Sequence, residues 1–92
     1  MLDFNFIRDE QPMHSKQVSF AGGIEWEEFE KAQAANIIES HHDFYGDFRW
    51  SSQNVKQKIA MLTPAIKAEV SNLAAILKQA FAGNFGLVAF GD

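Results

Sequence analysis

The sequence predicts an α+β fold, with three helices packed on a small, mostly antiparallel sheet formed by the N- and C-terminal segments. Two observations predict the sheet: apolar and polar residues alternate over residues 2–7, and a short apolar run occupies residues 87–90. A third predicts the helices, because apolar residues recur at helical spacing between residues 24 and 82. A mainly α-helical chain with extended ends is the alternative.

Composition favours one folded domain over residues 1–92. The chain is 47% hydrophobic and 13% aromatic, which supplies a core and excludes a disordered polypeptide. It contains no cysteine, so we expect a cytoplasmic protein rather than a small secreted domain stabilised by disulfides. We also expect no signal peptide and no membrane contact, since no apolar stretch is long enough to span a bilayer.

The first two strands are expected before residue 24. Leu2, Phe4 and Phe6 fall on one side of an extended segment, as in a strand with one buried face. A polar loop with a proline follows over residues 9–16. Residues 18–20 form a second short strand, which Gly22 and Gly23 are expected to end.

Three helices are expected next. The first covers residues 24–40, with a stripe formed by Trp26, Phe29, Gln33 and Ile37. The second begins at a cap provided by Ser51 or Ser52 and ends before Thr63-Pro64, where threonine is a good N-cap and proline suits the first helical position.

The third helix has the most regular apolar stripe. It follows Pro64 and continues to about residue 82, and Gly83 is expected at the position after the helix. The stripe recurs at helical spacing, which predicts the main core helix; it consists of Ile66, Val70, Leu73, Leu77 and Ala80.

Charge is distributed unevenly along the chain. Residues 1–48 carry ten acids against three bases, a net of −7, while residues 49–92 carry five bases against two acids, a net of +3. An acidic half repels nucleic acid and attracts basic protein surfaces, so we expect a protein partner and no nucleic acid. The predicted partner-binding residues are Glu25, Glu27, Glu28, Glu30, Asp43 and Asp47. A solvated helix face is the alternative interpretation.

Residues that could support catalysis are few. His41 and His42 are adjacent, and neighbours on a helix diverge by about 100°, so they do not converge on a metal. The third histidine, His14, lies in a loop, and the sequence contains no nucleophile motif and no phosphate-binding loop. We therefore expect no metal site, no cofactor and no enzymatic activity.

The segment of residues 41–52 is dense in aromatic residues. We expect Tyr45 and Trp50, with Phe44 and Phe48, to anchor a corner in the core around a turn at Gly46. Arg49 is expected to close the corner by pairing with Asp43, Asp47 or the acids of the first helix.

The same segment, His-His-Asp-Phe-Tyr-Gly-Asp-Phe-Arg-Trp-Ser-Ser followed by Val55 and Lys56, resembles small bacterial immunity proteins. The resemblance covers about 15 of the 92 residues. Proteins of that class neutralise the toxins of polymorphic or contact-dependent growth inhibition systems. The resemblance implies an inhibitor that binds a cognate toxin domain, such as a nuclease, and blocks its active site. A structural or regulatory homo-oligomer that uses the stripe of the third helix as its interface is the alternative.

Overall fold

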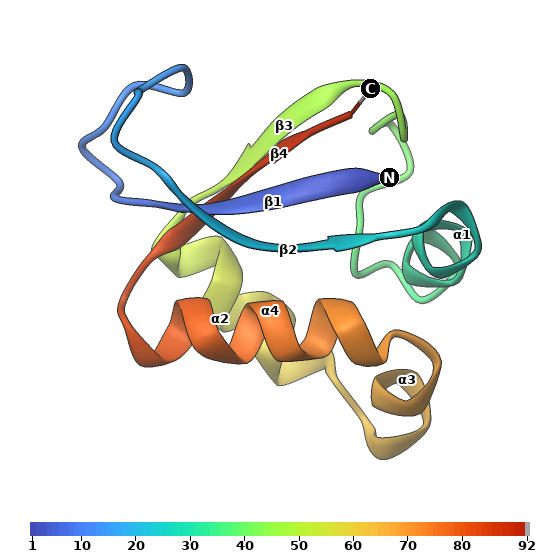
Figure 1. Cartoon of the computed structure of the whole chain (residues 1–92). Coiled ribbons are helices and arrows are strands. Elements are labelled where there is room, and N and C mark those ends of the chain that lie inside the picture. The colour runs from blue at the N-terminus through green and yellow to red at the C-terminus, as the bar shows by residue number, and fades with distance from the viewer. Residues whose placement is uncertain (92) are drawn as a thin grey trace.

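The protein has an α+β fold with one four-stranded sheet and four helices, described here from a computed structural model over residues 1–91 (Figure 1). The elements in chain order are β1 (Leu2–Ile7), β2 (Ser19–Ile24), α1 (Trp26–Ala34), β3 (Asp47–Trp50), α2 (Ser52–Met61), α3 (Pro64–Glu69), α4 (Ser71–Ala82) and β4 (Gly86–Phe90). The predicted fold class is confirmed, and the mainly α-helical alternative is wrong.

The sheet is fully antiparallel, with strand order β2-β1-β4-β3. The first and last strands of the chain are therefore its two central strands, and Ala89 of β4 lies between Phe4 of β1 and Phe48 of β3. Strand β3 was not predicted, since residues 47–50 were expected in a connection. Strand β2 was predicted too short, because Gly22 and Gly23 lie inside it rather than after it.

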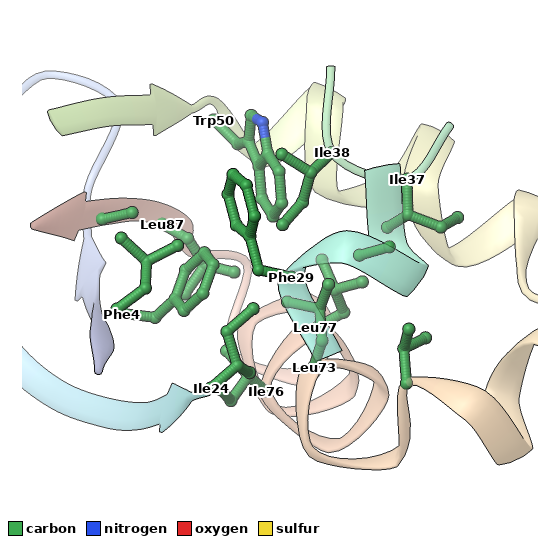
Figure 2. Packing of buried hydrophobic residues seen from close by; sticks show 14 of the residues in the cluster. Phe4, Ile24, Phe29, Ile37, Ile38, Trp50, Leu73, Ile76, Leu77 and Leu87 are labelled. Carbon is green, nitrogen blue, oxygen red and sulfur yellow. The ribbon is translucent and has the colours of Figure 1, made fainter. Parts of the chain in front are cut away.

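Helices α2 and α4 cover one face of the sheet, while α1 lies at the end of β2 (Figure 1). The core forms between these layers. Phe4 and Leu87 from the sheet are buried together with Leu73 and Leu77 of α4, as the close-up shows (Figure 2). The predicted stripe is confirmed over Val70, Leu73, Leu77 and Ala80, which are all fully buried.

The first helix is nine residues long and ends well before residue 40, so its predicted length was wrong. Asn36 adopts the left-handed conformation with φ 62°, and its amide donates to Gln33 O at 3.0 Å. The Ile37 amide donates to Ala32 O at 2.9 Å, which completes a Schellman termination. Ile37 lies beyond the end of the helix but is still buried. Its position in the sequence therefore fits the helical pattern of apolar residues although it is not part of the helix.

The predicted third helix is divided in two at Val70, whose φ of −124° and ψ of 49° lie outside the helical region. Thr63 caps α3 and Pro64 opens it, as predicted. At the end of α4, Asn84 with φ 58° occupies the left-handed position that was predicted for Gly83. The Phe85 amide then donates to Ala80 O at 2.8 Å, which closes a second Schellman motif.

Helix α2 begins as predicted. Ser51 is its N-cap, and a reciprocal pair of hydrogen bonds with Asn54 forms a capping box: Asn54 N donates to Ser51 Oγ at 3.1 Å, and Ser51 N donates to Asn54 Oδ1 at 2.9 Å. Because Ser51 directly follows β3, this cap fixes the angle between the strand and the helix that covers it.

Candidate partner-binding surface

The acids of the first helix do not form one face. Glu25 is the N-cap residue, and its side chain makes no capping hydrogen bond. Glu27 and Glu30 are exposed on α1, whereas Glu28 is partly buried and points away from them toward α4. Successive helical residues diverge by about 100°, so Glu28 is directed toward α4 while Glu27 and Glu30 face solvent.

Glu28 caps the start of α4 from a different helix. Its Oε2 accepts a hydrogen bond from the Leu73 amide at 2.7 Å, and its Oε1 accepts one from Asn72 Nδ2 at 2.9 Å. The local N-cap residue, Val70, has no side chain that could accept such a bond. A carboxylate at this position satisfies an amide that the helix leaves unpaired and faces the positive end of the helix dipole.

A shallow hollow of about 530 Å³ lies where α1, α3 and β2 meet. Lys31 is the one base among its lining residues, so the hollow is acidic. It is lined by Met1, Gly23, Glu25, Glu27, Glu28, Lys31, Glu69 and Asn72. Glu69 was not among the predicted binding residues because it lies in a half of the chain with a positive balance.

The turn over residues 43–46 lies between this helix and β3. The Gly46 amide donates to Asp43 O at 3.1 Å, and the Tyr45 amide donates to Asp43 Oδ1 at 3.1 Å, so Asp43 shapes the turn. Gly46 O also accepts a hydrogen bond from the Gly91 amide at 3.1 Å, which holds the turn against the end of β4. The predicted turn at Gly46 is confirmed.

The aromatic residues of this segment separate into buried and exposed groups. Phe44, Phe48 and Trp50 are buried, as predicted, but Tyr45 is 65% exposed, so its predicted place in the core is wrong. Phe48 and Trp50 point into the core from the same face of β3, Phe44 is buried as well, and Tyr45 is exposed at the turn.

Two exposed aromatic rings contact Phe44. Trp26 is 49% exposed and contacts the Phe44 ring edge-on at 5.4 Å, while the Tyr45 ring contacts Phe44 at 5.2 Å. Glu30 lies one helical turn from Trp26, and Asp43 and Asp47 flank Tyr45 in the sequence. We call Trp26, Glu30, Asp43, Tyr45 and Asp47 the aromatic–acidic surface.

Arg49 does not pair with any of the predicted acids. Its guanidinium donates to the backbone carbonyls of Arg8 at 2.8 Å, Asp9 at 3.0 Å and Gln11. The strand places this side chain on the sheet face opposite α2 and α4, where the loop after β1 passes over it. Arg49 therefore holds the loop after β1 through backbone carbonyls and does not neutralise the exposed carboxylates of Asp43 and Asp47.

The structure contains a buried polar cluster that the sequence did not indicate. Lys58 of α2 is only 6% exposed, and its Nζ donates to Ile37 O at 2.7 Å and to Glu39 Oε2 at 2.9 Å. The same ammonium lies 4.4 Å from the centre of the Trp50 ring, and Trp50 Nε1 donates to Glu39 Oε1 at 3.1 Å. The pairing joins residues far apart in the sequence, so spacing alone does not reveal it.

Electrostatics in this cluster keep Glu39 ionised. Burial acts to raise the pKa of Glu39, but hydrogen bonds from the Lys58 ammonium, its own backbone and the Trp50 indole outweigh burial and lower the pKa. The buried Lys58 ammonium has two hydrogen-bond acceptors and an aromatic ring around it, which offsets the cost of burying a charge. The cluster thus ties α2 and β3 to the segment that carries Asp43 and Tyr45.

The two adjacent histidines differ in environment. His42 stacks on Phe48 at 4.2 Å, and burial lowers its pKa despite the nearby Glu39 carboxylate, whereas His41 is exposed. Within the described residues, no group of three or more histidine, cysteine or acidic side chains is arranged to hold a metal ion.

Comparisons with known proteins return no match: no protein-family model, no curated protein and no solved structure is significantly similar to the chain. Over residues 1–91, no helix has the length and apolar character needed to cross a bilayer.

Proposed function

We propose that this protein is an immunity-type inhibitor that binds a cognate bacterial toxin domain and occludes its active site. The observation that carries the proposal is the aromatic–acidic surface. Trp26 and Tyr45 are both large and exposed, and the neighbouring carboxylates of Glu30, Asp43 and Asp47 form no ion pair within residues 1–91. The resemblance of the segment from His41 to Lys56 to immunity proteins adds to this observation.

The chemistry of the surface suits a basic protein partner. Tyrosine and tryptophan are enriched in interface cores because they bury a large area at low cost in conformational entropy. Unpaired carboxylates around them steer a basic partner and raise its association rate. A toxin that acts on nucleic acid carries such a basic surface, and an acidic inhibitor covers it by imitating the charge of the substrate.

The predicted acids have different parts in this proposal. Glu27, Glu30, Asp43 and Asp47 are exposed and available to a partner. Glu25 is exposed as well, at the rim of the acidic hollow. Glu28 is committed to α4, so we assign it a structural role and leave it out of the proposed contact set. The proposed protein acts in the cytoplasm, without a cofactor and without catalysis.

The homo-oligomer built on the third-helix stripe finds no support, because the stripe faces inward. Leu73, Leu77 and Ala80 are buried in the core of the same chain and offer no surface to a second copy.

The proposal is tested by affinity capture of the partner and by the kinetics of its association. The tagged protein is used as bait in a lysate of the source organism, and we expect it to enrich a basic toxin domain that mass spectrometry identifies. Association of the purified toxin is then measured for the wild type and for a Glu30→Lys, Asp43→Lys, Asp47→Lys variant at two salt concentrations. We expect slower association for the variant, and slower association of the wild type at high salt, because screening shortens the reach of the field to about 8–10 Å.

A Lys-to-Glu reversal outside the aromatic–acidic surface provides the control. Lys56→Glu changes an exposed charge on α2 and should leave association unchanged or slightly faster. Co-expression of the toxin with the wild-type chain should restore growth of a sensitive host. Unchanged association rates in both comparisons, or a captured toxin whose activity persists in the complex, would rule out this mode of inhibition.

A further inference from the structure

Strand β2 is an open edge of the sheet. It pairs only with β1, and within residues 1–91 none of its backbone groups makes a hydrogen bond on the outer side. The strand carries Phe20, which is 63% exposed, and residues 18–24 contain neither a charge nor a proline. Charged residues and prolines usually protect the edge strands of natural sheets, because unpaired backbone groups are a template for another strand. Strand β2 lacks this protection.

A hollow of about 250 Å³ runs beside this edge, between β2 and α4. The strand side is formed by Gly22 and Gly23, and the helix side by Asn72, Ala75 and Gln79. Gly22 has φ 147°, and a Cβ there would lie 3.0 Å from Ile76 Cδ1, so this glycine lets α4 approach the strand closely. The small residues leave room along the edge for the side chains of an added strand.

The edge has one irregularity, a bulge opposite Phe4 and Asn5 of β1 that leaves Ala21 without a register partner. Bulges bend and twist a strand, and they deter pairing with a straight one. The pairing proposed below therefore has to accommodate this bulge near the middle of the strand in both copies.

We propose that β2 pairs antiparallel with β2 of a second copy of the chain, which joins the two four-stranded sheets into one continuous sheet. The interface is isologous, and each copy contributes Phe20 and the hollow beside α4. This inference does not depend on the proposed toxin inhibitor, since it uses the edge strand and not the aromatic–acidic surface.

Charge complementarity supports a second copy as the occupant. Lys16 lies just before β2, while Glu25 and Glu27 lie just after it at the acidic hollow. Antiparallel pairing places the start of one strand beside the end of the other. Lys16 of each copy therefore meets the acidic hollow of the other copy, and the twofold symmetry makes this contact twice. The charge-free residues between these ends allow the strands to approach without repulsion.

The oligomeric state is measured by sedimentation equilibrium across about a hundredfold range of protein concentration, because association depends on concentration. We expect the mass to rise from 10.4 kDa toward twice that value, with the modest affinity of a small interface. Phe20→Lys should remain a monomer over the whole range. Tyr45→Lys is the matched control, since Tyr45 has nearly the same exposure and lies outside the edge; it should dimerise like the wild type.

A charge exchange tests the antiparallel geometry. Lys16→Glu should weaken dimerisation, and the combination Lys16→Glu with Glu25→Lys should restore it, while far-UV circular dichroism confirms that each variant is folded. Wild-type protein that is monomeric at every concentration would overturn the proposal. Equal loss of dimer in Phe20→Lys and Tyr45→Lys, or failure of the double exchange to recover what Lys16→Glu loses, would also overturn it.

Discussion

Glu28 shows how one side chain departs from the pattern of its neighbours. In the sequence it is one of four acids within six residues, and it was grouped with them as a partner-binding residue. In the structure it accepts hydrogen bonds from Leu73 N and Asn72 Nδ2, at the beginning of a helix whose own cap residue is valine. The acceptor lies more than forty residues away in sequence from the donors it serves, so helical spacing could not identify it.

This role predicts a difference in stability between adjacent glutamates. Glu28→Ala should lower the free energy of unfolding by about 1–2 kcal/mol, the usual cost of losing a helix N-cap or a hydrogen bond to a charged group. Glu27→Ala, at an exposed position of the same helix, should stay within about 0.5 kcal/mol of the wild type. Urea denaturation of both variants makes the comparison, and equal effects would mean that the cap contributes nothing.

The adjacent histidines provide a second contrast, in pH dependence. Burial depresses the pKa of His42 in the folded state, so the unfolded chain binds this proton more readily. The stability associated with neutral His42 is fully present above its unfolded-state pKa of about 6.5 and is lost as pH falls below that value. The free energy of unfolding should therefore decline from pH 7 to pH 5.5 with a smaller slope in His42→Gln. A His41→Gln variant with the same reduced slope would contradict the assignment to His42.

At the scale of helices, the N-caps were predictable from the sequence, whereas the C-terminal ends were not. Ser51 and Thr63 cap α2 and α3 as the sequence indicates, because a cap is a local arrangement of three or four residues. The end of α1 was missed because Ile37 falls on the helical stripe although Asn36 has already left the helix. The apolar spacing predicted the burial of Phe29 and Ile37 correctly, but it did not predict the exposure of Trp26 or the end of the helix.

Asn36 yields a prediction on the helix end itself. A left-handed residue other than glycine or asparagine costs about 1–2 kcal/mol, so Asn36→Ala should destabilise the protein by about 1 kcal/mol. Asn36→Gly should keep or raise stability, because glycine is the preferred residue at this position. Ala34→Gly, two residues earlier and inside the helix, should have the opposite sign and cost about 0.5–1 kcal/mol. Thermal melts of the three variants test the pattern, and a stable Asn36→Ala would refute the role of the left-handed turn.

Among the strands, too, some were predictable from the sequence and one was not. Residues 2–7 and 87–90 were predicted from alternation and from an apolar run, and both are strands. Strand β3 was missed because it has only four residues and its hydrogen bonds go to β4, which lies distant in sequence. The aromatic–acidic surface was partly predictable: its acids stand out in the sequence, but the exposure of Trp26 and Tyr45 depends on how the strand and helix are placed.

At the scale of the whole molecule, internal contacts use basic and acidic side chains in equal number. Two of the five bases in residues 49–92 are used inside the fold: Lys58 is buried against Glu39, and Arg49 is bound to backbone carbonyls. The acids of residues 25–47 remain exposed apart from Glu28 and Glu39. Two bases and two acids are thus used inside the fold, and a basic protein that approaches residues 25–47 still meets an excess of exposed carboxylates.

The central position of β4 in the sheet has a consequence for how the nascent chain folds during synthesis on the ribosome. Strands β1 and β3 do not pair with each other, and β3 has no partner strand until β4, the last of the described elements, is available. Until residues 86–90 leave the exit tunnel, the nascent chain holds an incomplete sheet and an uncovered set of aromatic side chains. Pairing then has to close nearly the full length of the chain, a slow event because loop closure is costly in entropy. Completion of the sheet therefore depends on residues 86–90, and chaperones that bind exposed aromatic segments can act until these residues have left the exit tunnel.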